Sequence, residues 1–285
     1  MQAAFQKDDT LLADIEHARL QPEALHVWWL GQSGFLVQWE GRHLLFDPYL
    51  SDSLTKKYAA TDKPHDRMTE LVVDPARLDF IDVVTSSHNH TDHLDAETLG
   101  PLLDVNASLT VVVPAANQDF AAHRLNVDPA RLTPLCVGAP MTVEPFRLHA
   151  IPAAHEGLDR DEAGCYRYIG LVAEVGPWTI YHSGDTLWYD GLEDYLAPFD
   201  LDLMLLPING RKPERRVAGN LDGEQAAQLA HRCGAKQAVP CHYDMFYFNT
   251  ETPALFIDTA TAIGQPYTVM RNGERLSLLK DSVVA

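Results

Sequence analysis

Residues 88–93 read His88-Asn89-His90-Thr91-Asp92-His93, which places three imidazoles and one carboxylate within six positions. Side chains of both kinds bind first-row metals. In a loop that leaves a strand, His88 and His90 can point to the same side, with Asp92 and His93 one turn further on. The stretch predicts a metal site that can address two ions. A solvated polar loop or a helix-cap cluster is the alternative, although three crowded histidines contribute little to a fold unaided.

Three more side chains of the metal-binding type come directly after strands that we expect further along the chain. His155, Asp185 and His242 each lie in the short segment that follows such a strand. Folds that combine strands and helices gather their active sites at strand ends. An isolated residue of this kind is more often structural than functional. Together with residues 88–93, the three predict the rest of one ligand set.

The order of the expected elements predicts an α/β (α+β) fold. A helix over residues 9–20 precedes three short strands within residues 25–46. Residues 51–75 are polar and without a clear period, so we expect a long loop that covers a site. Strands and helices then alternate from a strand over residues 80–85 to a final hairpin through Asn272-Gly273. This order predicts sheets that are covered by helices.

Composition excludes several classes of protein. The net charge of -18 makes nucleic acids and anionic membranes poor partners. No stretch is long and apolar enough to span a bilayer, and the N-terminus lacks the features of a signal peptide. The four cysteines are scattered and read as free thiols. We therefore expect a cytoplasmic protein with a small-molecule partner, and a homo-oligomer remains open.

One basic cluster departs from the acidic composition. Arg211, Lys212, Arg215 and Arg216 crowd into six residues that follow an expected strand. If the end of that strand lies near the metals, Arg211, Lys212 and Arg215 are candidates to bind a phosphate or carboxylate of the substrate, because arginine binds oxyanions with two hydrogen bonds. The alternative is a solvated loop whose charges offset nearby acids.

Several further motifs occur in the order of one known family. The sequence resembles the metallo-β-lactamase superfamily over nearly its whole length from about Ala24, and the nearest branch is that of L-ascorbate-6-phosphate lactonase and related metal-dependent hydrolases. Tyr243 stands where that lactonase segment carries a second histidine. The segments that carry the resemblance are Trp28 to Phe35, Leu45 to Pro48, Leu71 to Pro75, residues 88–93, Pro152 to His155, Tyr181 to Asp185 and Pro240 to Asp244.

The resemblance implies a four-layer αββα sandwich with two metals at one edge. It implies a single domain over residues 1–285, with residues 1–24 as an N-terminal helical extension. His88, His90 and His155 would hold the first metal. The second metal would be held by Asp92, His93 and His242, Asp185 would bridge the two ions, and Asp47 would support a ligand from behind. We place His182 behind the ligands as well.

The expected activity is hydrolysis by a water that two divalent ions activate, with Zn and Mn preferred and Fe also suited. Asp92 and Asp185 are the expected catalytic carboxylates, and Asp92 is the candidate general base if one metal is bound. The favoured substrate is a lactone or other ester of a small anionic molecule. A phosphodiesterase is the first alternative. A metal-binding or sensor module without turnover is the second.

Overall fold

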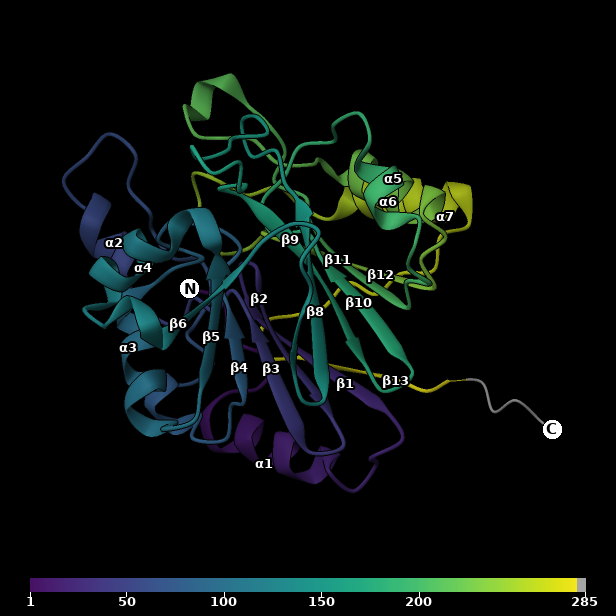
Figure 1. Cartoon of the computed structure of the whole chain (residues 1–285). Helices are drawn as coiled ribbons and strands as arrows, with labels where there is room; N and C mark the ends of the chain where they lie inside the picture. The colour runs from purple at the N-terminus through teal and green to yellow at the C-terminus, as the bar shows by residue number, and fades with distance from the viewer. Residues whose placement is uncertain (281–285) are drawn as a thin grey trace.

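The computed structural model describes residues 1–280, in which two β-sheets pack face to face between two layers of helices (Figure 1). The first sheet has the order β13-β1-β2-β3-β4-β5-β6. Its strands are β1 (Leu25–Gly31), β2 (Gly34–Trp39), β3 (Arg42–Phe46), β4 (Val83–Thr85), β5 (Thr110–Pro114), β6 (Leu132–Leu135) and β13 (Arg275–Leu278).

The second sheet has the order β12-β11-β10-β9-β8-β7. In both sheets one half is antiparallel and the other half is parallel. The strands of the second sheet are β7 (Met141–Val143), β8 (Phe146–Pro152), β9 (Ile169–Val175), β10 (Trp178–His182), β11 (Leu203–Pro207) and β12 (Gln237–Cys241).

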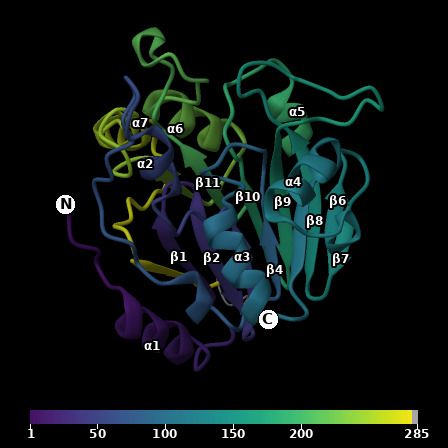
Figure 2. The same ribbon diagram turned by 90° about the vertical axis from the view of Figure 1, so that its left-hand side faces the viewer.

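Helices cover the outer face of each sheet. The helices α1 (Asp8–Ala18), α3 (Ala96–Val105) and α4 (Gln118–Leu125) lie on the first sheet, and Figure 2 turns this side toward the viewer. On the second sheet lie α5 (Leu192–Leu196), α6 (Gly223–Arg232) and α7 (Ala254–Ile263). The short helix α2 (Ser53–Tyr58) belongs to the long segment between β3 and β4. The predicted four-layer αββα architecture is confirmed.

The alternation of side chains along β1 shows why the core has two parts. Val27 and Trp29 pack in the core between the sheets, whereas Trp28 and Leu30 pack in the core under α1 and α3. Successive side chains of a strand point to opposite faces. A strand that is covered on both faces is therefore apolar throughout, and all seven residues of β1 are buried.

The N-terminal helix is tied to the first sheet. Leu11 and Ile15 of α1 are fully buried in the outer core, and the indole Nε1 of Trp28 donates a hydrogen bond of 2.9 Å to Asp14. We therefore propose that residues 1–24 extend one domain rather than form a unit of their own. No helix in residues 1–280 has the length and apolar character of a membrane span.

Two local predictions need correction, and two strands were missed. The strand expected over residues 80–85 is limited to β4, because the segment before it turns to bond Asn106 and His43. The predicted C-terminal hairpin is wrong, since β13 pairs antiparallel with the distant strand β1 and not with the segment directly before the turn at Asn272-Gly273. The edge strands β6 and β7 were not predicted, because they are short and Pro134 interrupts β6.

Candidate metal centre

Five strand ends converge on one edge of the sandwich. The parallel strands β3 and β4 end on the same side of the first sheet, and β8, β10 and β12 end together on one side of the second. The loops that follow these strands carry all the predicted metal ligands and the supporting carboxylate. These residues are Asp47, His88, His90, Asp92, His93, His155, Asp185 and His242.

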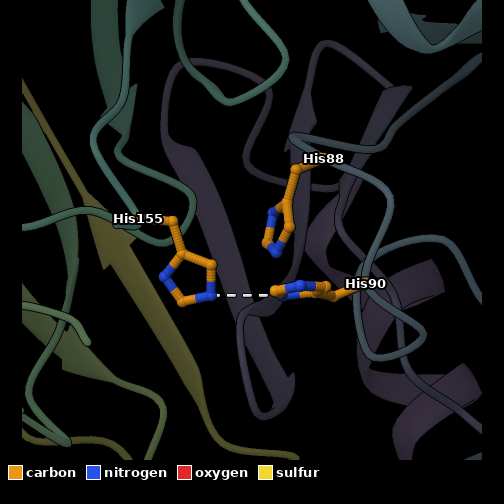
Figure 3. Close-up of side chains that lie close together, drawn as sticks. All are labelled: His88, His90 and His155. Carbon is orange, nitrogen blue, oxygen red and sulfur yellow. Dashed lines mark hydrogen bonds between the residues drawn. The ribbon is translucent and has the colours of Figure 1, made fainter. Parts of the chain in front are cut away.

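The first group of nitrogen donors comes from two loops. His88, His90 and His155 point toward one another, with donor atoms that all lie within 4.8 Å (Figure 3). Nε2 of His155 lies 3.2 Å from Nδ1 of His90. Imidazole nitrogens at this spacing can be joined by one cation, so the group predicted to hold the first metal is assembled.

The second group lies beside the first. Asp92, His93 and His242 also bring donor atoms within 4.8 Å of one another. Oδ2 of Asp92 lies 3.7 Å from Nε2 of His93 and 3.7 Å from Nε2 of His242. These are the residues that the sequence predicts for a second metal.

Asp185 stands between the two groups. Its Oδ1 lies 3.4 Å from Nε2 of His93, and its Oδ2 lies 3.4 Å from Nε2 of His242 and 3.6 Å from Nε2 of His155. A carboxylate with both oxygens turned to ligands of both groups has the position that a bridge requires.

The loop that carries Asp185 depends on a glycine. Gly184 has φ +58°, and a Cβ there would lie 2.7 Å from Cβ of Ser87 in the neighbouring loop. Only glycine combines this backbone conformation with so close an approach. Gly184 thereby allows the loops after β4 and β10 to touch, which brings Asp185 to the histidines.

Hydrogen bonds behind the donors fix the ring orientations. Nδ1 of His93 lies 2.7 Å from Oδ2 of Asp47, and Nδ1 of His155 lies 3.0 Å from the carbonyl oxygen of Gly219. Each acceptor favours a proton on Nδ1, which leaves the lone pair on Nε2. Both histidines therefore present Nε2 to the centre of the cluster, and Asp47 has the predicted supporting position.

His182 also lies behind the ligands, but it acts on the loops. Its Nε2 lies 2.8 Å from the carbonyl oxygen of Ser33, and its ring stacks on Phe46 with centroids 4.9 Å apart. The backbone N–H of Gly184 donates to Nδ1 of His182 over 3.3 Å. His182 thus links the loops after β1 and β10, and its hydrogen bonds within residues 1–280 go to backbone groups of these loops.

The cluster has polar atoms that lack partners within residues 1–280. Nε2 of His88, Nε2 of His93 and Oδ1 of Asp185 are buried and accept or donate no hydrogen bond. A buried polar atom without a partner is costly, and a cation would satisfy all three. The donor chemistry and the geometry therefore fit divalent metals.

The ionisation of the cluster suits metal binding. Burial lowers the pKa of His88 well below its usual value, and burial also lowers the pKa of His155. Burial opposes the charge on Asp185, but His93 and His242 hold the pKa of this carboxyl well below its usual range. Neutral imidazoles and an ionised carboxylate are the forms that bind metals. His93 differs, because burial opposes its charge but Asp185 and Asp92 raise the pKa of His93 well above its usual value. A metal would therefore displace a proton from this ring.

Part of the cluster lines a cavity of about 370 Å³, whereas His88 and His93 lie behind the wall. This volume falls within the range of small-molecule sites. The residues 51–75 supply part of the wall, as the sequence predicts. Basic and aromatic side chains gather around the opening: Lys57, Tyr58, Lys63, His65, Arg124, Tyr168, Arg216, Phe246 and Phe248.

The cations of this wall differ in their partners. Arg216 pairs with Asp62 over 2.6 Å, and Lys63 donates to the backbone carbonyl of Arg216. Lys57 and Arg124 form no ion pair with a carboxylate in residues 1–280. Arg124 donates to the carbonyl oxygens of Asn89 and Leu94 over 2.6 and 3.3 Å, and Lys57 donates to Thr91 over 3.4 Å.

The predicted substrate-binding residues lie elsewhere. Arg215 and Lys212 pair with Glu251, and Arg215 also donates to the carbonyl oxygen of Asn209 over 2.6 Å. Arg211 is exposed and does not line the described cavity. The structure therefore does not support Arg211, Lys212 and Arg215 as contacts for a substrate in this cavity. Their neighbour Arg216 does line it.

Several cavity residues had no signal in the sequence. Gln32 lies in the loop after β1. Its Nε2 donates a hydrogen bond of 2.7 Å to Oδ2 of Asp92 and lies 3.0 Å from Nε2 of His242. The ring centroid of Tyr168 lies 5.3 Å from that of His88.

Tyr243, which stands where the lactonase segment carries a second histidine, is buried against Trp29. Its hydroxyl donates to the carbonyl oxygen of Met270, so Tyr243 belongs to the core.

Comparison with known proteins decides the family. A model of the beta-lactamase superfamily domain matches residues 42–243, which is more than half of the chain and includes the whole ligand set. The chain belongs to the metallo-β-lactamase superfamily. The superfamily is thus confirmed, whereas the lactonase branch stays a prediction.

Relatives of this superfamily member span its whole fold. It is 29% identical over 260 residues to a UPF0173 metal-dependent hydrolase of Carboxydothermus hydrogenoformans, a match that covers 89% of this chain and 100% of the relative. A protein of the same name from Sulfurisphaera tokodaii is 24% identical, covering 88% and 98%. The structure of the metallo-beta-lactamase fold protein YhfI from Bacillus subtilis matches with a TM-score of 0.64 at 18% identity, covering 90% and 99%.

Proposed function

We propose that this member of the metallo-β-lactamase superfamily is a metal-dependent hydrolase with a dinuclear centre. One observation carries the proposal: seven donor side chains from separate loops converge beside a cavity of small-molecule size, and five of them, His90, Asp92, His155, Asp185 and His242, line its wall. Its relatives are named metal-dependent hydrolases, which agrees with the proposal. We assign the first metal to His88, His90 and His155 and the second to Asp92, His93 and His242, with Asp185 as the bridge.

Two divalent cations, Zn or Mn with Fe also suited, would supply Lewis acidity and activate a water for attack on a carbonyl or phosphorus centre. The chain itself aims the donors. Asp47 and the Gly219 carbonyl fix the tautomers of His93 and His155. Gln32 donates to Asp92 and so holds one carboxylate oxygen in place. Asp92 faces the cavity and would accept a proton only in a form with one metal bound.

We propose that the substrate is a lactone or other ester of a small anionic molecule. The chain has a net charge of -18, yet the cavity wall carries Lys57 and Arg124 without carboxylate partners in residues 1–280. Burial lowers the pKa of Arg124, and the charge of Asp95, which forms no ion pair with it, offsets this only in part. A phosphate or carboxylate of the substrate would supply the missing negative charge.

Phosphodiester hydrolysis is the second candidate function. A phosphodiester is itself anionic, so it would suit the cations of the cavity wall as well as a dinuclear centre. A binding module without turnover is less compatible with the geometry. A purely structural metal site is closed by protein ligands, whereas this cluster faces a cavity.

The test is turnover by the metal-loaded protein of three compounds with one shared leaving group. They are a carboxylate-bearing ester, its uncharged counterpart and a phosphodiester, and a panel of lactones extends the first class. We expect the charged ester or a lactone to be hydrolysed fastest, and Asp185→Ala to abolish that turnover. Preferred turnover of the phosphodiester would favour the second candidate. Metal bound without turnover of any compound would overturn the proposal that the protein is a hydrolase.

A further inference from the structure

Two of the four cysteines face each other across the edge of the sandwich. Sγ of Cys136 lies 2.8 Å from Sγ of Cys165, although 29 positions separate the two residues in the chain. Cys136 directly follows β6, the edge strand of the first sheet, and Cys165 lies in the excursion between β8 and β9 of the second sheet. We propose that these thiols form a reversible disulfide that ties this excursion to the first sheet.

The backbone on both sides already holds the sulfur atoms in place. The N–H of Cys165 donates to Oδ1 of Asp161 over 2.8 Å, and its carbonyl accepts from the N–H of Asp161 over 2.9 Å. On the other side, the carbonyl of Cys136 accepts from Ala139 over 3.2 Å. Two thiols that are positioned by their own turns need to approach by less than about 1 Å to bond, so little rearrangement is required.

The other two cysteines serve as an internal contrast. Cys241 is fully buried in the core between the sheets, and Cys233 lies at the end of α6. Neither forms a close sulfur–sulfur contact within residues 1–280. An oxidant that reaches the protein surface therefore meets one pair that can close and two thiols that cannot.

The reaction balances with a peroxide as the oxidant. Burial and the neighbouring thiol raise the pKa of Cys136 to about 11, so Cys136 is protonated at neutral pH. One sulfur of the pair takes one oxygen from hydrogen peroxide to give a sulfenic acid and one water. The other sulfur then displaces that oxygen as a second water, and the sulfur–sulfur bond forms. A dithiol reductant reverses the change.

The disulfide would restrain a segment that reaches the metal centre. Cys165 precedes Tyr168 by three residues, and the Tyr168 ring lies 5.3 Å from the ring of His88 and 5.7 Å from that of His155. Between Cys165 and Tyr168, the carbonyl oxygen of Arg167 accepts a hydrogen bond from Nδ2 of Asn117, which follows β5 of the first sheet. The bond itself does not depend on the proposed hydrolase activity. It would hold residues 157–168 more firmly whether or not a substrate is present.

The experiment uses the full chain, purified with reductant and then treated with hydrogen peroxide equimolar to protein. Remaining thiols are alkylated, and intact mass and peptide mapping follow. We expect loss of two alkylatable thiols, one linked peptide pair that contains Cys136 and Cys165, and full reversal by dithiothreitol. Cys136→Ser and Cys165→Ser should not form the link, whereas the matched control Cys233→Ser should form it as the wild type does.

A second readout separates a restraining bond from an incidental one. Oxidation should slow amide hydrogen exchange in residues 157–168 and raise the melting temperature of the wild type by roughly 5 °C. The single variants should show neither change. Wild-type protein that reaches only sulfinic acid at Cys165, or that links another cysteine pair, would overturn the proposal even if a serine variant fails to fold. Unchanged exchange after complete bond formation would overturn the claim of restraint.

Discussion

Nδ1 of His93 lies 2.7 Å from Oδ2 of Asp47, and neither side chain is exposed to solvent. The other oxygen of Asp47 accepts the backbone N–H of Ser87 over 2.9 Å. One carboxylate thus fixes both a ligand ring and the start of the loop that contains residues 88–93. The candidate metal centre therefore depends on a residue that directly follows another strand, β3, and contacts a proposed ligand from behind.

Asp47→Asn should weaken metal binding more than it weakens the fold. An amide can still accept the Ser87 N–H, but its NH2 group favours the wrong tautomer of His93. Loss of such a supporting contact lowers metal affinity by roughly 10–100-fold. Competition with a chromophoric chelator measures the affinity. Asp202→Asn is the control, since Asp202 is a buried carboxylate at the start of β11, at the opposite end of the strand from the donor cluster. Equal zinc affinity in both variants would show that Asp47 does not position His93.

Asp185→Ala should be the most damaging single change of a ligand. Asp185 approaches ligands of both groups, so its loss should disturb both metals and reduce turnover by about a hundredfold or more. His242→Ala removes a donor of one group and should mainly weaken one metal. Metal content and kcat of the two variants, measured side by side, make the comparison. Two metals and near-normal turnover in Asp185→Ala would rule out the bridging assignment.

Arg124→Gln and Lys57→Gln should raise KM for an anionic ester more than KM for its neutral counterpart. A lost charge-assisted hydrogen bond weakens binding by about tenfold to a hundredfold. Arg211→Gln is the matched control, because Arg211 is exposed outside the cavity. Metal content is measured alongside, since Arg124 also bonds the loop that carries the histidines. Selective loss in Arg211→Gln instead would restore the residue choice that the sequence predicts.

His43 should make the fold less stable in acid. Burial, reinforced by Arg19, lowers the pKa of His43 to about 4, against an ordinary value of 6.5. At a pH between these two pKa values, His43 is protonated in the unfolded chain but neutral in the folded chain. The free energy of unfolding therefore falls as the pH falls from about 6.5 to about 4. The full effect is roughly 3 kcal/mol, and none of it is present above pH 6.5.

Urea unfolding at pH 7.5 and pH 5 tests this dependence. His43→Gln should lose less stability than the wild type over that interval, and His17→Gln, a change at an exposed position in α1, should behave as the wild type does. If all three proteins lose the same stability, His43 does not titrate as its burial implies.

The convergence of these donor side chains was predictable because its signal is local. A strand followed directly by histidine or aspartate is visible in the sequence, and parallel strand ends meet at one edge of a sheet. The close approach of Gly184 to Ser87 explains why the loops can touch, but no pattern along the chain reveals that contact. Gln32 illustrates the limit, since its role follows only from the folded position of His242.

Charge clustering pointed to only one basic residue of the cavity, Arg216. Arg211, Lys212 and Arg215 are adjacent in sequence, but the ion pairs with Glu251 turn two of them away. Arg124 is a single cation on α4 without a motif, and only the packing of that helix against the loop brings it to Asn89. The predicted pairing of the C-terminal strand was wrong for a similar reason, because its partner β1 lies some 250 positions earlier in the chain.

Metal content measures the central claim most directly. The protein, purified without chelator and reloaded with zinc or manganese, should contain two equivalents per chain by elemental analysis. Asp185→Ala should contain fewer metal equivalents per chain, and a chelator should remove the metal from the wild type. A folded wild-type protein that holds no metal, and whose melting temperature does not respond to added zinc or manganese, would contradict the account.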